Sequence, residues 1–263
     1  MPYRIDVCRP APEAFDLLIE LGALDIEPLN DGLAAIIPDH VTQDRVRDVL
    51  GLATIKVSAA TPRDNGSVWL LSPRPVRIGG VQIASPEAAS STGALKLIDS
   101  HAFGTGHHPT TALCIQAVEE ILSVEPLDSV LDVGTGSGIL ALAALKMGAS
   151  QAVGVDIDPD ALKVAAENAR LNNVADRLQL VLGGPNTVNG RWPLVLANVL
   201  AAPLIEMAPV LVQRVGKRGR LVLSGIPSSL EREVRQAYQH YGMQHVGSKT
   251  QAGWTLVIAQ ASW

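Results

Sequence analysis

The sequence predicts an α/β protein in which a small amino-terminal α+β domain precedes a doubly wound, mostly parallel sheet. Three observations lead to this prediction. From residue 111 onward, helix-like and strand-like segments alternate at regular spacing, which is typical of a parallel sheet covered by helices on both faces. The first sixty residues instead run strand, helix, strand, strand, helix, strand. Between these parts, residues 85–100 are small and polar with no sustained period, as expected of a linker.

The composition restricts the class of protein. Of 263 residues, 47% are apolar, so the chain is too hydrophobic to be disordered and long enough to bury a core. Lys and Arg number 21 against 26 Asp and Glu, and this charge of −5 has the wrong sign for direct nucleic-acid binding. Cys8 and Cys114 lack disulfide or zinc spacing, which is typical of a reducing compartment. No apolar segment predicts export or membrane association, and we expect a cytoplasmic protein.

The amino-terminal domain is expected over residues 1–84, followed by the linker at 85–100 and a second domain at 101–263. The tripeptide Asn30-Asp31-Gly32 separates two extended segments and predicts a hairpin. Strand, helix, strand, strand, helix and strand are expected, in that order, at 3–7, 11–21, 24–29, 33–37, 41–50 and 54–58. This order is that of the ferredoxin-like fold.

The second domain is expected to contain a seven-stranded sheet. The first five strands alternate with helices and are therefore expected to be parallel, whereas the last two are expected to form a hairpin. These strands are placed near 129–133, 152–157, 177–182, 194–198, 220–226, 244–248 and 254–259.

A glycine-rich turn follows the first of these strands. Residues 132–138 have the form Asp-x-Gly-x-Gly-x-Gly, and backbone can approach a ligand closely at such a turn. The last glycine of a dinucleotide fingerprint is replaced by Ile139, so the turn favours S-adenosylmethionine (SAM) over NAD. A tight strand-to-helix connection without a ligand is the alternative.

Polar residues also stand at the ends of the second and fourth strands. Asp156, which lies 22 residues after Gly134, can accept hydrogen bonds from both hydroxyls of a ribose. Asp158 precedes a proline and is expected to cap the next helix. Asn198 ends the fourth strand, although an Asn there could equally cap a helix. A ligand role is preferred because three strand ends point toward one crevice.

Residues 93–263 resemble the PrmA family of bacterial ribosomal-protein methyltransferases, which modify protein eleven of the large ribosomal subunit. The most specific block is Ala-Phe-Gly-Thr-Gly-His-His-Pro-Thr-Thr at residues 102–111. Further blocks follow in the family's order and spacing at 134–140, 155–159, 197–201 and 223–226. The resemblance implies a Rossmann-like, SAM-dependent enzyme that methylates lysine and/or N-terminal amines of that ribosomal protein. The amino-terminal domain, which is mildly acidic, is expected to recognise such a substrate.

The resemblance also implies a set of residues that contact SAM. These are Phe103, Thr105, Thr111, Gly134, Thr135, Gly136, Asp156, Ile157 and Asn198. Asn198 is in addition the candidate catalytic residue, since its amide can accept a hydrogen bond from the acceptor amine. The segment 103–108 is expected to close over the donor. No metal is expected, because His101, His107 and His108 are better explained as a hydrogen-bonding loop.

The chain departs from the family on the substrate side. Where the family has Asp-Pro-Gly, residues 99–101 are Asp-Ser-His, and a segment rich in tryptophan is reduced to Trp69. Two alternatives therefore stay open: a methyltransferase of the same fold that acts on another protein or a small molecule, and a SAM-binding module without turnover. The missing dinucleotide fingerprint argues against a nicotinamide oxidoreductase.

Overall fold

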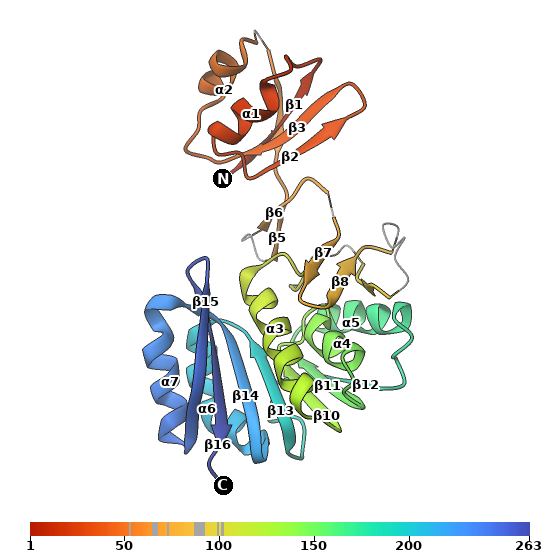
Figure 1. Cartoon of the computed structure of the whole chain (residues 1–263), viewed down its shortest axis with the longest axis vertical. Helices are drawn as coiled ribbons and strands as arrows, with labels where there is room; N and C mark the ends of the chain where they lie inside the picture. The colour runs from red at the N-terminus through yellow and green to blue at the C-terminus, as the bar shows by residue number, and fades with distance from the viewer. Residues whose placement is uncertain (53, 65–67, 73, 87–92, 99, 101–102) are drawn as a thin grey trace. The chain divides into compact units, whose positions relative to one another are not determined.

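The structure of the chain is a computed structural model that describes residues 1–52, 54–64, 68–72, 74–86, 93–98, 100 and 103–263 (Figure 1). The chain divides into two compact units, Met1–Pro73 and Arg74–Trp263. Within the described ranges, every helix is too short or too polar to cross a lipid bilayer.

The first unit has the predicted ferredoxin-like order. Its antiparallel sheet has the strand order β2-β3-β1-β4, with β1 (Tyr3–Cys8) between β3 (Gly32–Ile37) and β4 (Lys56–Ala59). The hairpin of β2 (Asp25–Leu29) and β3 is confirmed. The unit also contains α1 (Ala14–Glu20), α2 (Gln43–Leu50) and the short strands β5 (Pro62–Arg63) and β6 (Val68–Trp69).

Local signals in the sequence explain where the helices of this unit begin and end. The hydroxyl of Thr42 accepts a hydrogen bond from the backbone N–H of Arg45 at 3.2 Å and caps the start of α2. Gly51 ends α2 in the left-handed conformation, with φ +65°. Leu18 of α1 and Val46 of α2 are fully buried against the sheet, so both helices are held by one apolar core.

The second unit contains the predicted seven-stranded, mostly parallel sheet. Its strand order is β12-β11-β10-β13-β14-β16-β15, and only β16 runs antiparallel to its neighbours. The strands are β10 (Ser129–Val133), β11 (Gln151–Asp156), β12 (Leu178–Leu182), β13 (Trp192–Asn198), β14 (Val215–Pro227), β15 (Met243–Gln251) and β16 (Trp254–Ala261).

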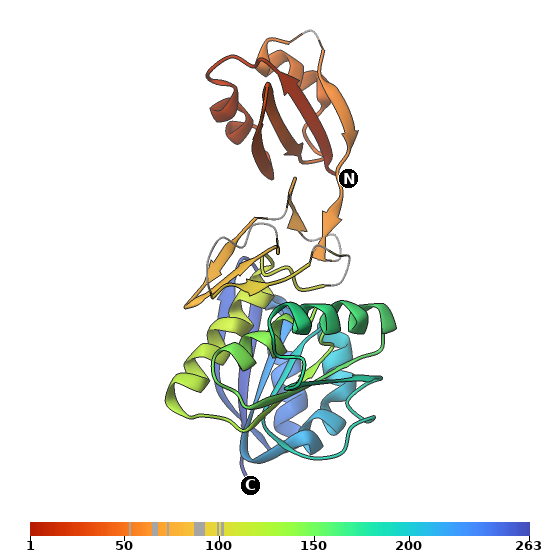
Figure 2. The ribbon, with the colours of Figure 1, turned by 90° about the vertical axis from the view of Figure 1, so that its right-hand side faces the viewer.

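Helices cover both faces of this sheet (Figures 1 and 2). One apolar core joins the sheet to α3 (Pro109–Val124), α4 (Ile139–Lys146) and α5 (Pro159–Leu171). A second core joins the opposite face to α6 (Ala201–Arg214) and α7 (Glu231–His240). The predicted doubly wound architecture is therefore confirmed.

The division between the units falls eleven residues earlier than the sequence-based boundary at 84. The strands β7 (Val76–Ile78), β8 (Val81–Ala84) and β9 (Leu95–Lys96) form a small sheet within the second unit. Ile83 and Leu95 are buried in the same core as α3 and α4. Burial of these apolar side chains assigns residues 74–84 to the second unit.

Part of the expected linker is also fixed to the second unit. The buried amide of Asn168 on α5 accepts from the N–H of Ile98 and donates to the carbonyl oxygen of Ser137, both at 2.9 Å. Asn172 accepts from the N–H of Lys96 at 2.9 Å. The linker residues 87–92 and 99 lie outside the described residues.

Candidate active site

The glycine-rich turn leaves the carboxyl end of β10 in a conformation that requires glycine. Gly134, Gly136 and Gly138 have φ of +70°, +55° and +81°, which side chains with a Cβ adopt only with strain. The N–H groups of Gly134 and Thr135 donate to the carbonyl oxygen of Val155 on β11, at 2.9 and 3.0 Å. The turn is thereby held over the end of the neighbouring strand.

The turn is also packed closely against two other segments. A Cβ on Gly136 would lie 2.6 Å from the carbonyl oxygen of Phe103, and a Cβ on Gly134 would lie 2.5 Å from Cγ1 of Val199. The N–H of Ser137 donates to the same carbonyl oxygen of Phe103 at 3.0 Å. Glycine is therefore needed here for close approach as well as for its backbone conformation.

Asp132 lies beneath the turn and anchors it to β10. Its Oδ2 accepts from the hydroxyl of Thr135 at 2.7 Å and from the N–H of Ala141 at 3.2 Å. The side chain is buried, and this burial raises the pKa of Asp132 to about 6, although the two hydrogen bonds oppose the shift. The Thr135 hydroxyl therefore helps to fix the turn.

Asp156 ends β11 and contacts the same turn. Its Oδ2 accepts from the N–H of Gly136 at 2.8 Å, and its Oδ1 accepts from the N–H of Asp158 at 3.0 Å. Each oxygen keeps a second lone pair for a further donor. Ile157 follows with its side chain 81% exposed. The predicted cap is confirmed, since the Asp158 carboxylate accepts from the N–H of Asp160 at the start of α5.

Asn198 ends β13. In the sheet, β10 alone separates β13 from β11, the strand that ends with Asp156. The Nδ2 atom of Asn198 donates to Oγ1 of Thr111, in the first turn of α3, at 3.5 Å. Its side chain is 8% exposed, and its Oδ1 has no hydrogen-bond partner among the described residues. The residue that caps α6 is Leu200, so the alternative role of Asn198 as a helix cap is excluded. Leu200 itself is 64% exposed.

The segment after residue 102 is fastened to the glycine-rich turn. The hydroxyl of Ser137 donates to the carbonyl oxygen of Gly104 at 2.7 Å. Thr105 accepts from the N–H of His107 through its hydroxyl at 3.4 Å. His101 and Ala102, which the sequence analysis included in this segment, lie outside the described residues.

A cluster of three rings, those of Phe103, His108 and Trp254, joins this segment to β16. His108 caps α3, because its Nδ1 accepts from the N–H of Thr110 at 3.3 Å. Its ring makes edge contacts with Phe103, at a centroid distance of 5.5 Å, and with Trp254 on β16, at 5.1 Å. Sequence reasoning missed Trp254, since no spacing signal links the last strand to residue 103.

The structure thus brings the predicted residues to one edge of the sheet. Direct contacts join Gly136 to Asp156, Thr111 to Asn198, and Gly136 to Phe103. The others belong to the same turn, the same strand end or the same segment: Gly134, Thr135, Ile157 and Thr105.

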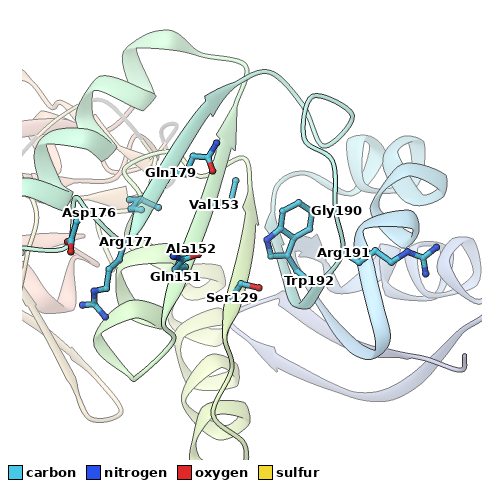
Figure 3. Close-up of a pocket in the computed structure, with 11 residues that line it drawn as sticks. Ser129, Gln151, Ala152, Val153, Asp176, Arg177, Gln179, Gly190, Arg191 and Trp192 are labelled. Carbon is cyan, nitrogen blue, oxygen red and sulfur yellow. The ribbon is translucent and has the colours of Figure 1, made fainter.

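A cavity of about 440 Å³ lies at the opposite edge of the same sheet (Figure 3). It is formed at the amino ends of the strands, around Ser129, Gln151, Gln179 and Trp192. Figure 3 shows the side chains of Arg177 and Arg191 directed away from each other. In open α/β sheets, ligands bind at the carboxyl ends of the strands, so this cavity is not the candidate active site.

The fold and the site together define a Rossmann-like methyltransferase that uses SAM as its cofactor. Residues 42–262 match the family model described as ribosomal protein L11 methyltransferase (PrmA). The chain belongs to this family. The predicted resemblance, enzyme class and fold class are therefore confirmed.

Individual relatives agree with this assignment. The chain is 34% identical over 281 residues to a ribosomal protein L11 methyltransferase of Myxococcus xanthus, covering 97% of this chain and 96% of the relative. It is 37% identical over 210 residues to one of Pelobacter propionicus, covering 77% and 68%. A crystal structure of a ribosomal protein L11 methylase from Lactobacillus delbrueckii is similar, with a TM-score of 0.65, 29% identity, and coverage of 72% and 99%.

Proposed function

We propose that this chain transfers methyl groups from SAM to lysine and/or N-terminal amines of ribosomal protein L11. The observation that carries the proposal is the buried Oδ1 of Asn198, which has no partner among the described residues and lies at the edge where the family motifs meet. A buried acceptor without a donor is costly, so such an atom indicates a ligand that supplies the donor. We further propose that the first unit recognises the protein substrate.

The residues at this edge fit SAM. Asp156 retains a lone pair on each oxygen for the two hydroxyls of a ribose. The glycine-rich turn leaves backbone rather than side chains facing the end of β10, so a nucleoside can approach closely. Ile157 presents an exposed apolar surface beside Asp156, where a purine ring could pack. When bound, SAM supplies an electrophilic methyl group on a sulfonium.

The chain must present the acceptor amine in its neutral form. A lysine amine of pKa about 10.4 costs roughly 4.6 kcal/mol to deprotonate at pH 7, whereas an α-amine near pKa 8 costs roughly 1.4 kcal/mol. Asn198 Oδ1 can accept an N–H hydrogen bond from the neutral amine and hold its lone pair toward the donor. An amide is not a base, so we propose that the proton leaves through water.

Leu200 lies two residues beyond Asn198 and offers an apolar contact for the acceptor. Its side chain is 64% exposed at the start of α6, whereas that of the next residue, Ala201, is buried. The methylene groups of a lysine side chain could pack there while the amine reaches Asn198. Orientation and exclusion of water would then supply most of the catalysis.

Mass spectrometry of purified L11 after incubation with the protein and isotopically labelled SAM tests this function. The wild-type protein should add label to lysine or N-terminal amines. Asn198→Ala should lower the rate at saturating SAM at least tenfold while changing the SAM Kd less, because it removes the amine's acceptor. Asn189→Ala, at an exposed position, is the matched control. The proposal would be contradicted if L11 stayed unlabelled after incubation with the wild-type protein and labelled SAM, or if Asn198→Ala left the rate unchanged.

A further inference from the structure

The stretch from Arg177 to Arg220 is strongly basic, although the chain as a whole is acidic. It contains six Lys and Arg and a single acidic residue, Glu206. By difference from the totals of 21 and 26, the rest of the chain contains 15 Lys and Arg against 25 Asp and Glu. The net charge of −5 therefore conceals a positively charged stretch.

The fold gathers these cations where the parallel strands of the large sheet begin, which we call the amino edge. Arg177 precedes β12 and Arg191 precedes β13, whereas Lys217, Arg218 and Arg220 lie near the start of β14. In the strand order, β11, β10 and β13 separate β12 from β14. Four strand spacings of about 4.8 Å give a row of cations roughly 19 Å long. Such a row suits an extended polyanion better than one small anion.

Most of these cations have no carboxylate partner. Arg220 pairs with Glu125 at 3.7 Å. The other five cations of the stretch make no ion pair with any residue that the structure describes. Asp128 and Asp176 also lie at the amino edge, but the cations outnumber these acids. Positive charge is therefore left over for a partner.

A tight turn at the start of β14 presents two of the cations to solvent. Lys217 and Arg218 are exposed, and Arg218 has a left-handed backbone with φ +56°. The N–H of Arg218 donates to the carbonyl oxygen of Trp263 at 3.0 Å, and its own carbonyl oxygen accepts from Nε2 of Gln260 at 3.0 Å. These bonds hold the two charges on a fixed backbone.

Two exposed aromatic side chains adjoin this turn. Trp263 and Tyr241 are 36% and 43% exposed. A Cβ on Gly242, the residue after Tyr241, would lie 3.5 Å from Cζ3 of Trp263, so the two aromatic residues are close to each other. Cations beside aromatic rings are typical of sites for single-stranded nucleic acids, because the cations contact phosphates while the bases stack on the rings.

The cavity around Trp192 lies in the same edge of the sheet. Arg177 and Arg191 line it together with Asp176. The two guanidinium groups are directed away from each other (Figure 3), so each can contact a different phosphate.

We propose that the amino edge binds a single-stranded nucleic acid. We define the amino-edge surface as Arg177, Arg191, Lys217, Arg218, Tyr241 and Trp263. The proposal is independent of the proposed function, because it concerns the edge opposite to Asp156 and Asn198. The net charge of the chain argues against a nucleic acid that covers the whole molecule. At physiological salt, however, charges interact over only about 8 Å, so the local excess of cations decides binding at this edge.

Fluorescence anisotropy with a labelled RNA of ~12 nucleotides that forms no base pairs tests the proposal. The triple variant Arg191→Gln, Lys217→Gln, Arg218→Gln should raise the Kd of the full chain for this RNA at least tenfold. It should also reduce the slope of log Kd against log salt by about 2, since each phosphate contact contributes about 0.7.

The control triple variant is Arg77→Gln, Lys163→Gln, Arg232→Gln. It removes the same charge from exposed positions elsewhere in the second unit and should keep the Kd for RNA within twofold of wild type. Both triple variants should keep the wild-type SAM Kd and thermal unfolding midpoint, because the substituted side chains are exposed.

Two further measurements separate stacking from charge and RNA from DNA. Tyr241→Ser should raise the Kd for RNA about tenfold without changing the salt slope, because it removes a stacking surface and no charge. A DNA strand of the same sequence identifies the source of the ligand. Binding of RNA alone would assign the surface to RNA, and equal binding would assign it to single strands in general.

Four results would overturn the proposal. The first is no binding of the RNA by the wild-type chain at low salt, and the second is an equal Kd for RNA in the two triple variants. The third is displacement of the RNA by S-adenosylhomocysteine, which would place the RNA at the carboxyl ends of the strands. The fourth is a polyglutamate of equal charge that binds as tightly as the RNA, which would make an acidic polypeptide the occupant.

Discussion

Substituting Gly136 by Ala should disrupt the link between the glycine-rich turn and Asp156. Alanine at φ +55° costs about 1 to 2 kcal/mol from backbone strain alone. Its Cβ would lie 2.6 Å from the carbonyl oxygen of Phe103, and reaching an ordinary contact of 3.4 Å requires a shift of roughly 0.8 Å. The 2.8 Å hydrogen bond from Gly136 N–H to Asp156 cannot survive a shift of that size away from Asp156.

The magnitude follows from adding these effects. A hydrogen bond to a charged group contributes about 1.5 to 3 kcal/mol, so the total loss of unfolding free energy should be about 2.5 to 5 kcal/mol. Gly51→Ala is the matched control, because Gly51 has φ +65° but no atom within 4 Å of an added Cβ. It should lose only the backbone contribution of about 1 to 2 kcal/mol.

Urea unfolding and titration calorimetry with SAM measure the two consequences. Gly136→Ala should weaken SAM binding at least tenfold, because Asp156 is the proposed acceptor for the ribose hydroxyls. Gly51→Ala should bind SAM as wild type does. The reasoning is refuted if Gly136→Ala loses no more stability than Gly51→Ala and also keeps the wild-type SAM Kd.

Three further predictions concern a buried acid, a buried amide and an exposed leucine. Burial raises the pKa of Asp132 from 3.8 to about 6. Between pH 4 and 6 the folded state therefore holds a proton that the unfolded chain has released. The contribution of this proton to the unfolding free energy is about 3 kcal/mol, and it is lost as the pH rises from 4 through 6. In Asp132→Asn this loss of unfolding free energy with rising pH should disappear. If the unfolding free energies of the variant and the wild type changed in parallel with pH, the prediction would be contradicted. Asn168→Ala should cost about 2 to 4 kcal/mol in urea unfolding, because it leaves unsatisfied the partners of one buried and one part-buried hydrogen bond. A cost below about 1 kcal/mol would count against this. Leu200→Ser should raise the KM for L11 severalfold without changing the SAM Kd. Val246→Ser, at another exposed apolar position, should change neither the KM nor the Kd. If the two substitutions had equal effects, the proposed contact between Leu200 and the acceptor would be contradicted.

The sheet of the second unit was predictable because its strands carry a strong local signal. Strands such as β10 and β13 are buried on both faces, so they are rich in apolar residues and stand out between amphipathic helices. The sequence missed the first five residues of β14, at 215–219, because Lys217, Arg218 and two glycines break the apolar run there.

The boundary between the units could not be predicted from local patterns. The strands β7, β8 and β9 have three, four and two residues, too few for a period of two to be recognised. They are strands because α3 and α4 bury one of their faces, which depends on contacts between residues far apart in the sequence. Propensity alone carries no information on such contacts.

The candidate site was predictable where it depends on topology. Parallel strands end at one edge, so the positions of Asp156 and Asn198 at strand ends were enough to place them together. The roles of Trp254 and Asn168 were not predictable, because each acts on a segment that is distant in sequence. The raised pKa of Asp132 likewise depends on burial that only the folded chain produces.

A crystal structure of the protein with S-adenosylhomocysteine tests the central claim most directly. The account predicts that the ribose hydroxyls lie within hydrogen-bond distance of the Asp156 carboxylate, with the sulfur facing Asn198. The account is contradicted if the nucleoside occupies the cavity around Trp192 at the amino ends of the strands, or any other surface away from Asp156 and Asn198.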